Sequence, residues 1–204
     1  MTNKPRPECE RRWRKQNSGW KQLHSSPQLQ RTEPNRCIAD LRLTDPRDDK
    51  RCIEQTKGGL LKDSYGWILD NDDFQQWRND EQSRLLWIKG DPGKGKTMLL
   101  CGIIDKLKKQ TANLVSYFFC QGTTDSRINN AMAVLRGLIY LLVEEQELLI
   151  PHVQKKYNDL GNRLLEDVNS WWVLSEIFTN ILQDPNLKST FLIIDLLDEC
   201  VTDL

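Results

Sequence analysis

The sequence predicts an α/β fold in which helices cover both faces of a parallel sheet. Three short apolar runs, at residues 84–89, 113–120 and 190–195, have the length and composition of buried strands. Between them, apolar residues recur three and four positions apart, which is typical of amphipathic helices. Strands that alternate with helices form parallel sheets. We expect a helical segment and a disordered, basic N-terminus to precede this layered domain.

The charges of the chain balance overall but are unevenly distributed. Lys and Arg total 29, and so do Asp and Glu, so no overall field favours nucleic acid. Residues 1–36 hold nine basic and three acidic residues in a polar stretch rich in Pro and Gln. Such a composition buries too little surface to fold, so we predict a disordered tail. A basic arm for RNA, DNA or acidic lipid is the alternative.

The sequence carries no sign of a membrane segment or a secretory signal. It contains no apolar run of about 18 residues, and its N-terminus lacks an apolar stretch. Its six cysteines form no C-x-x-C pair, so we expect thiols, and its two histidines have no ligand partner at zinc-binding spacing. We predict a cytoplasmic protein with no membrane contact and no specific nucleic acid partner.

Residues 37–82 are predicted to be a helical linker that leads into the sheet domain. Thr44-Asp45-Pro46 offers a cap and a first helical residue. Gly58-Gly59 breaks the stretch, and a second helix is expected over 63–69. Asp72-Asp73 then precede another short helix. We expect the aromatic residues of this linker to pack against the core.

The sheet domain is predicted over residues 83–204. The apolar positions from Ile128 to Leu142 lie on one face of a long helix. Pro151 is expected to begin another helix, and Trp172–Leu182 repeats the helical period. Asp184-Pro185-Asn186 should then end this helix before the last strand.

The stretch GDPGKGKT at residues 90–97 fits the pattern G-x-x-x-x-G-K-[ST]. Its glycines let backbone N–H groups close around a phosphate. Lys96 is expected to reach the β- and γ-phosphates, and the Thr97 hydroxyl to bind Mg²⁺. The loop lies between the predicted strand at 84–89 and an amphipathic helix at 97–109, whose N-terminus favours anions. The predicted nucleotide-binding residues are Gly90, Asp91, Pro92, Gly93, Lys94, Gly95, Lys96, Thr97 and Met98.

Acidic residues cluster at the end of the last predicted strand. Asp195 ends the apolar run, and Asp198 and Glu199 follow it. An Asp at the carboxyl tip of such a strand can hold Mg²⁺ opposite Thr97. We assign Asp198 and Glu199 as candidate catalytic residues that position or deprotonate an attacking water. Acids at a strand end are also commonly just solvated, so this assignment depends on its pairing with the loop.

From about Cys37 to Leu204 the sequence resembles the NACHT domains of fungal NOD-like receptors, which belong to the STAND class of P-loop NTPases. The stretches that carry the resemblance are TDPRDDKRCIEQTKGGLLKDSYGWIL (44–69), LLWIKGDPGKGKTML (85–99), VSYFFCQGTTDSRINNAMAVLRGLIYLL (115–142) and FLIIDLLDEC (191–200). The resemblance implies a three-layer P-loop NTPase fold that binds ATP or GTP with Mg²⁺. It also implies a nucleotide-controlled switch that oligomerises with protein partners and signals in self/non-self recognition.

By motif, the resemblance gives Lys96 and Thr97 the phosphate and Mg²⁺ roles, and Asp195 the metal-associated role. Asp198 and Glu199 match the hydrolytic pair of the family. The family usually has a small residue after the metal-associated Asp, whereas this chain has Leu196. We therefore expect slow or absent hydrolysis. Nothing in the sequence distinguishes adenine from guanine.

The resemblance also implies a sheet of order 5-1-4-3-2, in which a later strand separates the run at 84–89 from the run at 190–195. The sequence ends at Leu204, so we expect an incomplete sheet with unpaired edges, as in a truncated product. A non-enzymatic fragment or decoy that assembles with full-length relatives is the first alternative. A small-molecule kinase is the second, but Arg127, Arg136 and Arg163 lack the spacing of a lid.

Overall fold

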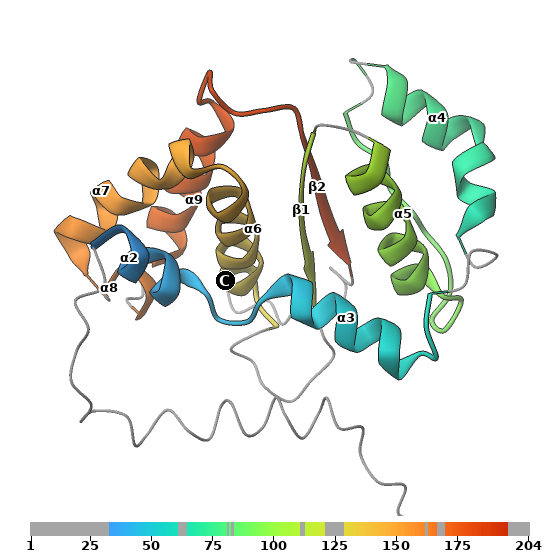
Figure 1. The fold of residues 1–204 in the computed structure, drawn as a ribbon, viewed down its shortest axis with the longest axis horizontal. Helices are drawn as coiled ribbons and strands as arrows, with labels where there is room; N and C mark the ends of the chain where they lie inside the picture. Colours follow the sequence, from blue (N-terminus) through green and yellow to red (C-terminus); the bar gives the residue numbers. More distant parts are fainter. Residues whose placement is uncertain are drawn as a thin grey trace, which may run out of the picture.

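Helices lie on both sides of a small parallel sheet. The computed structural model describes residues 33–60, 65–80, 82, 84–110, 113–120, 129–161, 163–166 and 170–195. Strands β1 (Leu114–Phe119) and β2 (Thr190–Asp195) form the sheet. Figure 1 shows α5 (Lys96–Gln110) on one side of it and α6 (Ala131–Glu145) on the other. The predicted α/β character is confirmed at this level, as a mixed helical protein with a two-stranded parallel sheet.

The two strands pair in parallel from Leu114 opposite Thr190 to Phe119 opposite Asp195. Every residue of β1 is buried, because helices pack against both of its faces. Strand β2 is confirmed where the sequence predicts it, but it is not buried throughout. Leu192 is 37% exposed, and no strand pairs with the second edge of β2 within the described residues.

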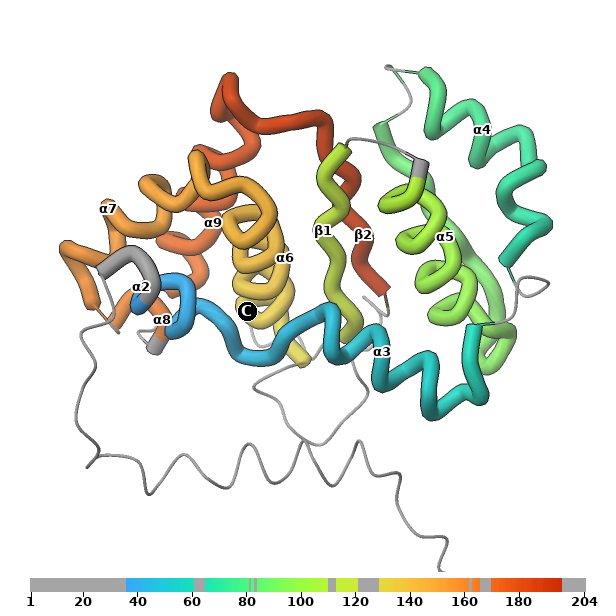
Figure 2. The backbone as a smooth tube through the Cα atoms, in the orientation of Figure 1, coloured from blue at the N-terminus to red at the C-terminus, as the bar shows by residue number. Residues whose placement is uncertain are grey.

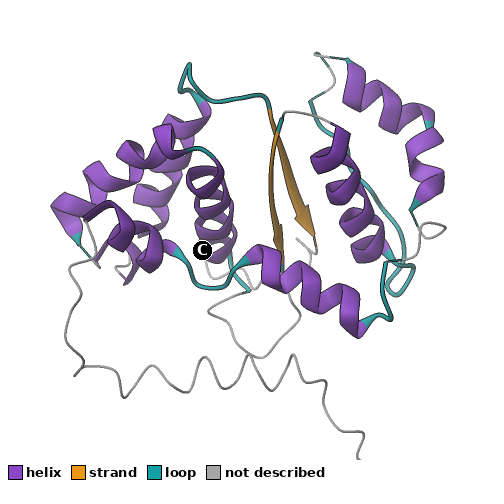
Figure 3. Ribbon diagram, in the orientation of Figure 1, coloured by secondary structure: helices purple, strands orange, loops and turns teal. Residues whose placement is uncertain are grey.

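The prediction of a strand at residues 84–89 is wrong. The segment belongs to no strand (Figure 3), although it leads directly into the glycine-rich loop. Leu86 and Ile88 pack against the core, whereas Leu85 and Trp87 are 79% and 68% exposed. A strand needs a hydrogen-bonded neighbour, and in the described part of the chain β1 and β2 pair only with each other. Exposed and packed side chains therefore alternate here without the ladder of backbone hydrogen bonds that would make the segment a strand.

Helix α6 lies at the centre of the fold, with buried residues at every position from Ala133 to Val143. The Asn130 side chain caps it by accepting a hydrogen bond from the N–H of Ala133 at 2.9 Å. The helix packs against β1 on one side and against neighbouring helices on the other, so the predicted single apolar face understates its burial. The connection from α6 to β2 consists of η4 (Glu147–Leu149), α7 (Ile150–Leu160), α8 (Arg163–Glu166) and α9 (Ser170–Leu182).

These connecting helices agree with the sequence prediction where it can be compared. Pro151 lies in the first turn of α7, and α9 ends at Leu182 as predicted. The predicted start of α6 at Ile128 lies outside the described residues. The helix is seen to run from Ala131 to Glu145.

The N-terminal helices are α2 (Glu33–Leu41), α3 (Pro46–Thr56), η3 (Gly66–Asp70) and α4 (Asp72–Asn79). The predicted cap of α3 is confirmed, because the Asp45 side chain accepts a hydrogen bond from the N–H of Arg47 at 3.0 Å. Gly58 and Gly59 follow α3 with φ angles of +85° and +96°, which only glycine adopts easily. The helix predicted over 63–69 is a 3₁₀ helix that begins at Gly66. Residues 1–32 and 61–64 lie outside the residues that the structure describes.

Helix α2 is fixed by an arginine from α6. It packs against α6 and α7. Arg136, which is only 9% exposed, donates hydrogen bonds to the backbone oxygens of Leu41 at 3.0 Å and Asp40 at 2.7 Å. These carbonyls end α2 and have no partner inside the helix. Arg136 therefore works as a cap for α2.

The described cysteines are thiols with one exception. Cys37, Cys101 and Cys120 are buried thiols. Cys52 on α3 is disulfide-bonded, so the prediction of thiols is wrong at that position. The described residues contain no group of three or more His, Cys, Asp or Glu side chains arranged to hold a metal ion. Among the described helices, none has both the length and the apolar character needed to cross a membrane.

Asp49→Asn on α3 is expected to stabilise the protein at pH 7 by at most about 3 kcal/mol. Burial raises the pKa of Asp49 from 3.8 to about 6, against a 2.7 Å hydrogen bond from the Thr44 hydroxyl. The folded protein therefore binds this proton more tightly than the unfolded chain, and it loses stability as the pH rises from about 4 to about 6. Asparagine accepts the same hydrogen bond without a charge.

Urea unfolding of both proteins between pH 4 and pH 7 checks this prediction. The difference in the free energy of unfolding should be small at pH 4 and should grow to its full value near pH 7. A difference that stays constant over this range would show that Asp49 does not titrate in it.

Candidate functional site

The glycine-rich loop turns sharply and leads directly into α5. Residues 90–95 are exposed, and α5 begins at Lys96. Gly93 and Gly95 have φ angles of +77° and +81°, a conformation that a side chain would strain. The N–H of Lys94 donates to the oxygen of Asp91 at 3.3 Å and closes the turn. Exposed backbone in such conformations, next to a helix N-terminus, is suited to binding an anion.

Lys96 folds back over this loop. Its ammonium donates to the backbone oxygens of Gly90 at 2.6 Å and Asp91 at 3.2 Å. Phosphate oxygens carry charge and accept stronger hydrogen bonds from an ammonium than neutral carbonyls do. The side chain therefore lies where a bound phosphate can compete for it.

Thr97 and Met98 are half-buried in the first turn of α5. The N–H of Leu99 donates to the oxygen of Gly95 at 3.0 Å, so the regular helical hydrogen bonds begin there. The N–H groups of a first helical turn have no partners inside the helix and carry a partial positive charge. This turn adds to the anion-binding character of the loop.

Asp195 lies at the carboxyl end of β2 and is 3% exposed. Helix α5 packs against this strand. Burial raises the pKa of the Cys101 thiol on α5 to about 12, and the charge of Asp195 contributes to the rise. Cys101 is four residues, or about one turn, beyond Thr97. Asp195, which the sequence predicts as the metal-associated acid, thus ends the strand against which α5 packs.

The other predicted acids cannot be placed. Asp198 and Glu199 lie outside the described residues, as does Leu196. Their assignment as the residues that act on water stays a prediction.

Two contacts that position α5 were missed by the sequence analysis. Tyr65 packs so closely on the helix that a Cβ added at Gly102 would lie 2.1 Å from its Cγ. Lys50 on α3 bonds to Asp105 of α5 at 2.6 Å and to Glu54 at 2.5 Å. The spacing of Lys50 and Glu54 is visible in the sequence as a helical i, i+4 pair, but nothing in the sequence indicates Asp105.

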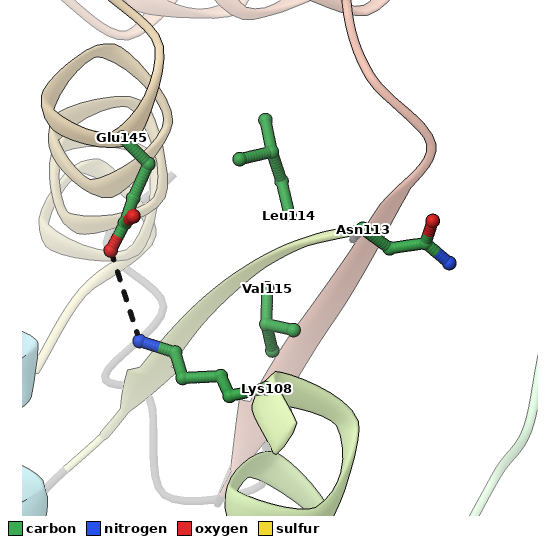
Figure 4. A pocket seen from close by; sticks show the side chains of 5 residues that line it. All are labelled: Lys108, Asn113, Leu114, Val115 and Glu145. Atoms are coloured by element: carbon green, nitrogen blue, oxygen red, sulfur yellow. Dashed lines mark ion pairs between the residues drawn. The ribbon is translucent and has the colours of Figure 1, made fainter. Parts of the chain in front are cut away.

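A small open cavity of about 180 Å³ lies away from the loop, beside the N-terminal end of β1 (Figure 4). Its lining includes Lys108 and Glu145, whose charged atoms are 3.9 Å apart. Ligands of open α/β sheets bind at the carboxyl ends of the strands. This cavity is at the opposite end, so it does not compete with the loop as the candidate site.

Comparison with known proteins places the chain in a family. No solved structure matches it. It is 68% identical over 169 residues to vegetative incompatibility protein HET-E-1 of Podospora anserina, an alignment that covers 82% of this chain and 12% of that relative. The family described as nephrocystin 3, N-terminal, matches residues 63–203, more than half of the 204-residue chain. This protein therefore belongs to the nephrocystin 3 N-terminal family.

Proposed function

We propose that this chain binds a nucleoside triphosphate, ATP or GTP, together with Mg²⁺, through the loop at residues 90–97. The observation that carries the proposal is the geometry of that loop. Two glycines with positive φ angles and an ammonium held over the backbone lie at the start of α5. The buried Asp195 ends the strand against which α5 packs. An anion with an attached divalent cation fits this combination of charges.

In this proposal different residues bind different parts of the Mg²⁺-nucleotide. Lys96 binds the β- and γ-phosphates, while Thr97 and Asp195 hold Mg²⁺. When bound, the metal neutralises phosphate charge. Asp198 and Glu199 act on a water molecule, with slow or absent turnover because of Leu196. The backbone of the remaining residues cradles the phosphates: Gly90, Asp91, Pro92, Gly93, Lys94, Gly95 and Met98.

The wider role we propose is that of a NACHT-type P-loop NTPase module, in which the nucleotide state controls signalling. The 68% identity to a protein named for vegetative incompatibility in Podospora anserina supports a place among fungal NOD-like receptors. The family match over residues 63–203 agrees with that placement. Cytoplasmic location and oligomerisation with protein partners belong to the same proposal. The chain spans about an eighth of that relative's length. The proposed signalling role, location and oligomerisation are therefore inferred from a much longer protein.

A second candidate is a non-enzymatic interaction module that assembles with related chains. The exposed Leu85 and Trp87 beside the loop favour it, because exposed apolar side chains mark contact surfaces. Co-purification with a full-length relative in the presence and absence of nucleotide tests this candidate. Its failure in both conditions would leave nucleotide binding as the function.

Equilibrium titration of the purified chain with ATP and with GTP, each with Mg²⁺ or with EDTA, tests the first proposal. We expect saturable binding of at least one nucleotide and a marked loss of affinity in EDTA, since Thr97 and Asp195 act through the metal. Thr97→Ala should remove most of the Mg²⁺ effect and leave the metal-free affinity unchanged. A folded chain that binds neither nucleotide would overturn the proposal.

A further inference from the structure

Helix α3 joins the two helices on opposite sides of the sheet. It runs along the lower part of the fold from the α6 side towards the α5 side, and it packs against β1 between them (Figures 1 and 2). Near its start, Arg47 donates to the Tyr140 hydroxyl at 2.9 Å and to Glu144 at 3.3 Å, both on α6. One turn further on, Lys50 reaches Asp105 of α5. A segment that precedes the loop in sequence therefore holds both flanking helices.

The contact with α5 is the more buried of the two. Lys50 is only 7% exposed, and its ammonium lies 2.6 Å from Asp105 Oδ1 and 2.5 Å from Glu54 Oε1. Burial alone would lower the pKa of Lys50, but the bonds to the two carboxylates outweigh it and raise the pKa. The side chain is therefore charged at neutral pH. A buried charge that loses a partner is strongly unfavourable, so α5 cannot move away from α3 without cost.

The contact between Lys50 and Asp105 acts on α5, the helix that directly follows the phosphate loop. Asp105 lies eight residues after Thr97, about 12 Å along a rigid helix. The fully buried Cys101 lies between them. The charges of Lys50 and Asp195 both reach its thiol, with opposite effects on its pKa. Lys50 thus contacts α5 from α3, and β2, the strand that ends in Asp195, packs against the same helix.

We propose that Lys50 is a positioning residue for the phosphate loop. By holding Asp105 it fixes α5, and with it Lys96 and Thr97, at the separation from Asp195 that a Mg²⁺-nucleotide requires. The proposal rests on the proposed nucleotide binding. It also makes α3 a means of control, because a movement of α3 reaches the loop through this contact.

The test compares four variants of the full chain: Lys50→Met, Asp105→Asn, Lys50→Arg and Glu144→Gln. Lys50→Met removes the contact with α5 and Asp105→Asn weakens it by removing the charge of the acceptor, while Lys50→Arg keeps the charge and tests rescue. Glu144→Gln is the matched control, since it removes an ion pair of the same helix α3 but does not touch α5. Mg²⁺-ATP affinity is measured at a temperature where every variant is fully folded. Amide hydrogen exchange of residues 96–101 is measured without nucleotide.

We expect Lys50→Met and Asp105→Asn to weaken Mg²⁺-ATP binding by roughly fivefold or more and to speed exchange at residues 96–101. Lys50→Arg should restore both quantities in part, and Glu144→Gln should behave as the wild type. If Lys50→Met does not fold, Asp105→Asn decides, because it keeps a neutral acceptor for the ammonium. A purely structural role would lower the unfolding temperature of the variants and leave the affinity of the folded protein unchanged.

Wild-type binding separates the two ways in which the proposal can fail. If the wild type binds Mg²⁺-ATP and both Lys50→Met and Asp105→Asn bind it equally well, the positioning role of Lys50 is overturned and nucleotide binding stands. If the wild type itself does not bind, the proposed function fails and the positioning role fails with it.

Discussion

Lys96→Ala is expected to lower the affinity of the chain for Mg²⁺-ATP by roughly 10- to 100-fold. In the structure the Lys96 ammonium bonds to the oxygens of Gly90 and Asp91 within the loop. A bound triphosphate would take over this ammonium, and each hydrogen bond between charged groups contributes about 1.5–3 kcal/mol. Alanine removes this contribution and leaves the backbone of the loop in place. The fold should be unaffected, because residues 90–95 are exposed and pack against little else.

Lys94→Ala is the matched control for this prediction. Lys94 lies two residues away in the same loop and is exposed. Both variants lose one positive charge, so a non-specific attraction between the loop and the anion would weaken equally in the two. Isothermal titration with Mg²⁺-ATP, together with thermal unfolding of each variant, distinguishes the cases. Equal losses of affinity would argue against a specific phosphate contact by Lys96, and wild-type affinity of Lys96→Ala would exclude it.

The elements that follow local rules could be predicted from the sequence. The cap of α3 at Asp45, the start of α7 near Pro151 and the end of α9 at Leu182 all depend on residues within one turn of each other. Strands β1 and β2 were also recognisable as apolar runs. The run at 84–89 has the same composition, but it is not a strand. Whether an apolar run becomes a strand depends on a neighbour to pair with, and the run itself does not encode that neighbour.

The candidate site divides in the same way. The loop glycines, Lys96 and Asp195 follow from a motif whose chemistry fixes the residue types at each position. The residues that hold α5 in place do not, because Lys50 and Asp105 are 55 positions apart and meet only in the folded chain. Arg136 is a similar case. Its spacing from Arg127 and Arg163 argues against a lid, but only the packing of α2 against α6 shows what it does.

Arg136→Met is expected to destabilise the protein by about 2–4 kcal/mol. The guanidinium is buried, and it satisfies the oxygens of Asp40 and Leu41 at the end of α2. Methionine fills a similar space with no donor, so both carbonyls lose this partner away from water. An unsatisfied buried acceptor costs about 1–3 kcal/mol. The favourable interaction of a cation with the C-terminal end of α2 is lost as well.

Urea unfolding at neutral pH measures the loss of stability in Arg136→Met. Two further variants show whether the lost hydrogen bonds cause it. Arg136→Lys keeps the charge but presents a single ammonium in place of the two-pronged guanidinium, so it should lie between the wild type and Arg136→Met. Arg163→Met removes an exposed arginine on α8 and should change the free energy of unfolding by less than about 0.5 kcal/mol. If Arg136→Met were no more harmful than Arg163→Met, the end of α2 would have to be satisfied by water. Helix α2 would then depend on its packing against α6 and α7, and not on Arg136, for its place in the fold.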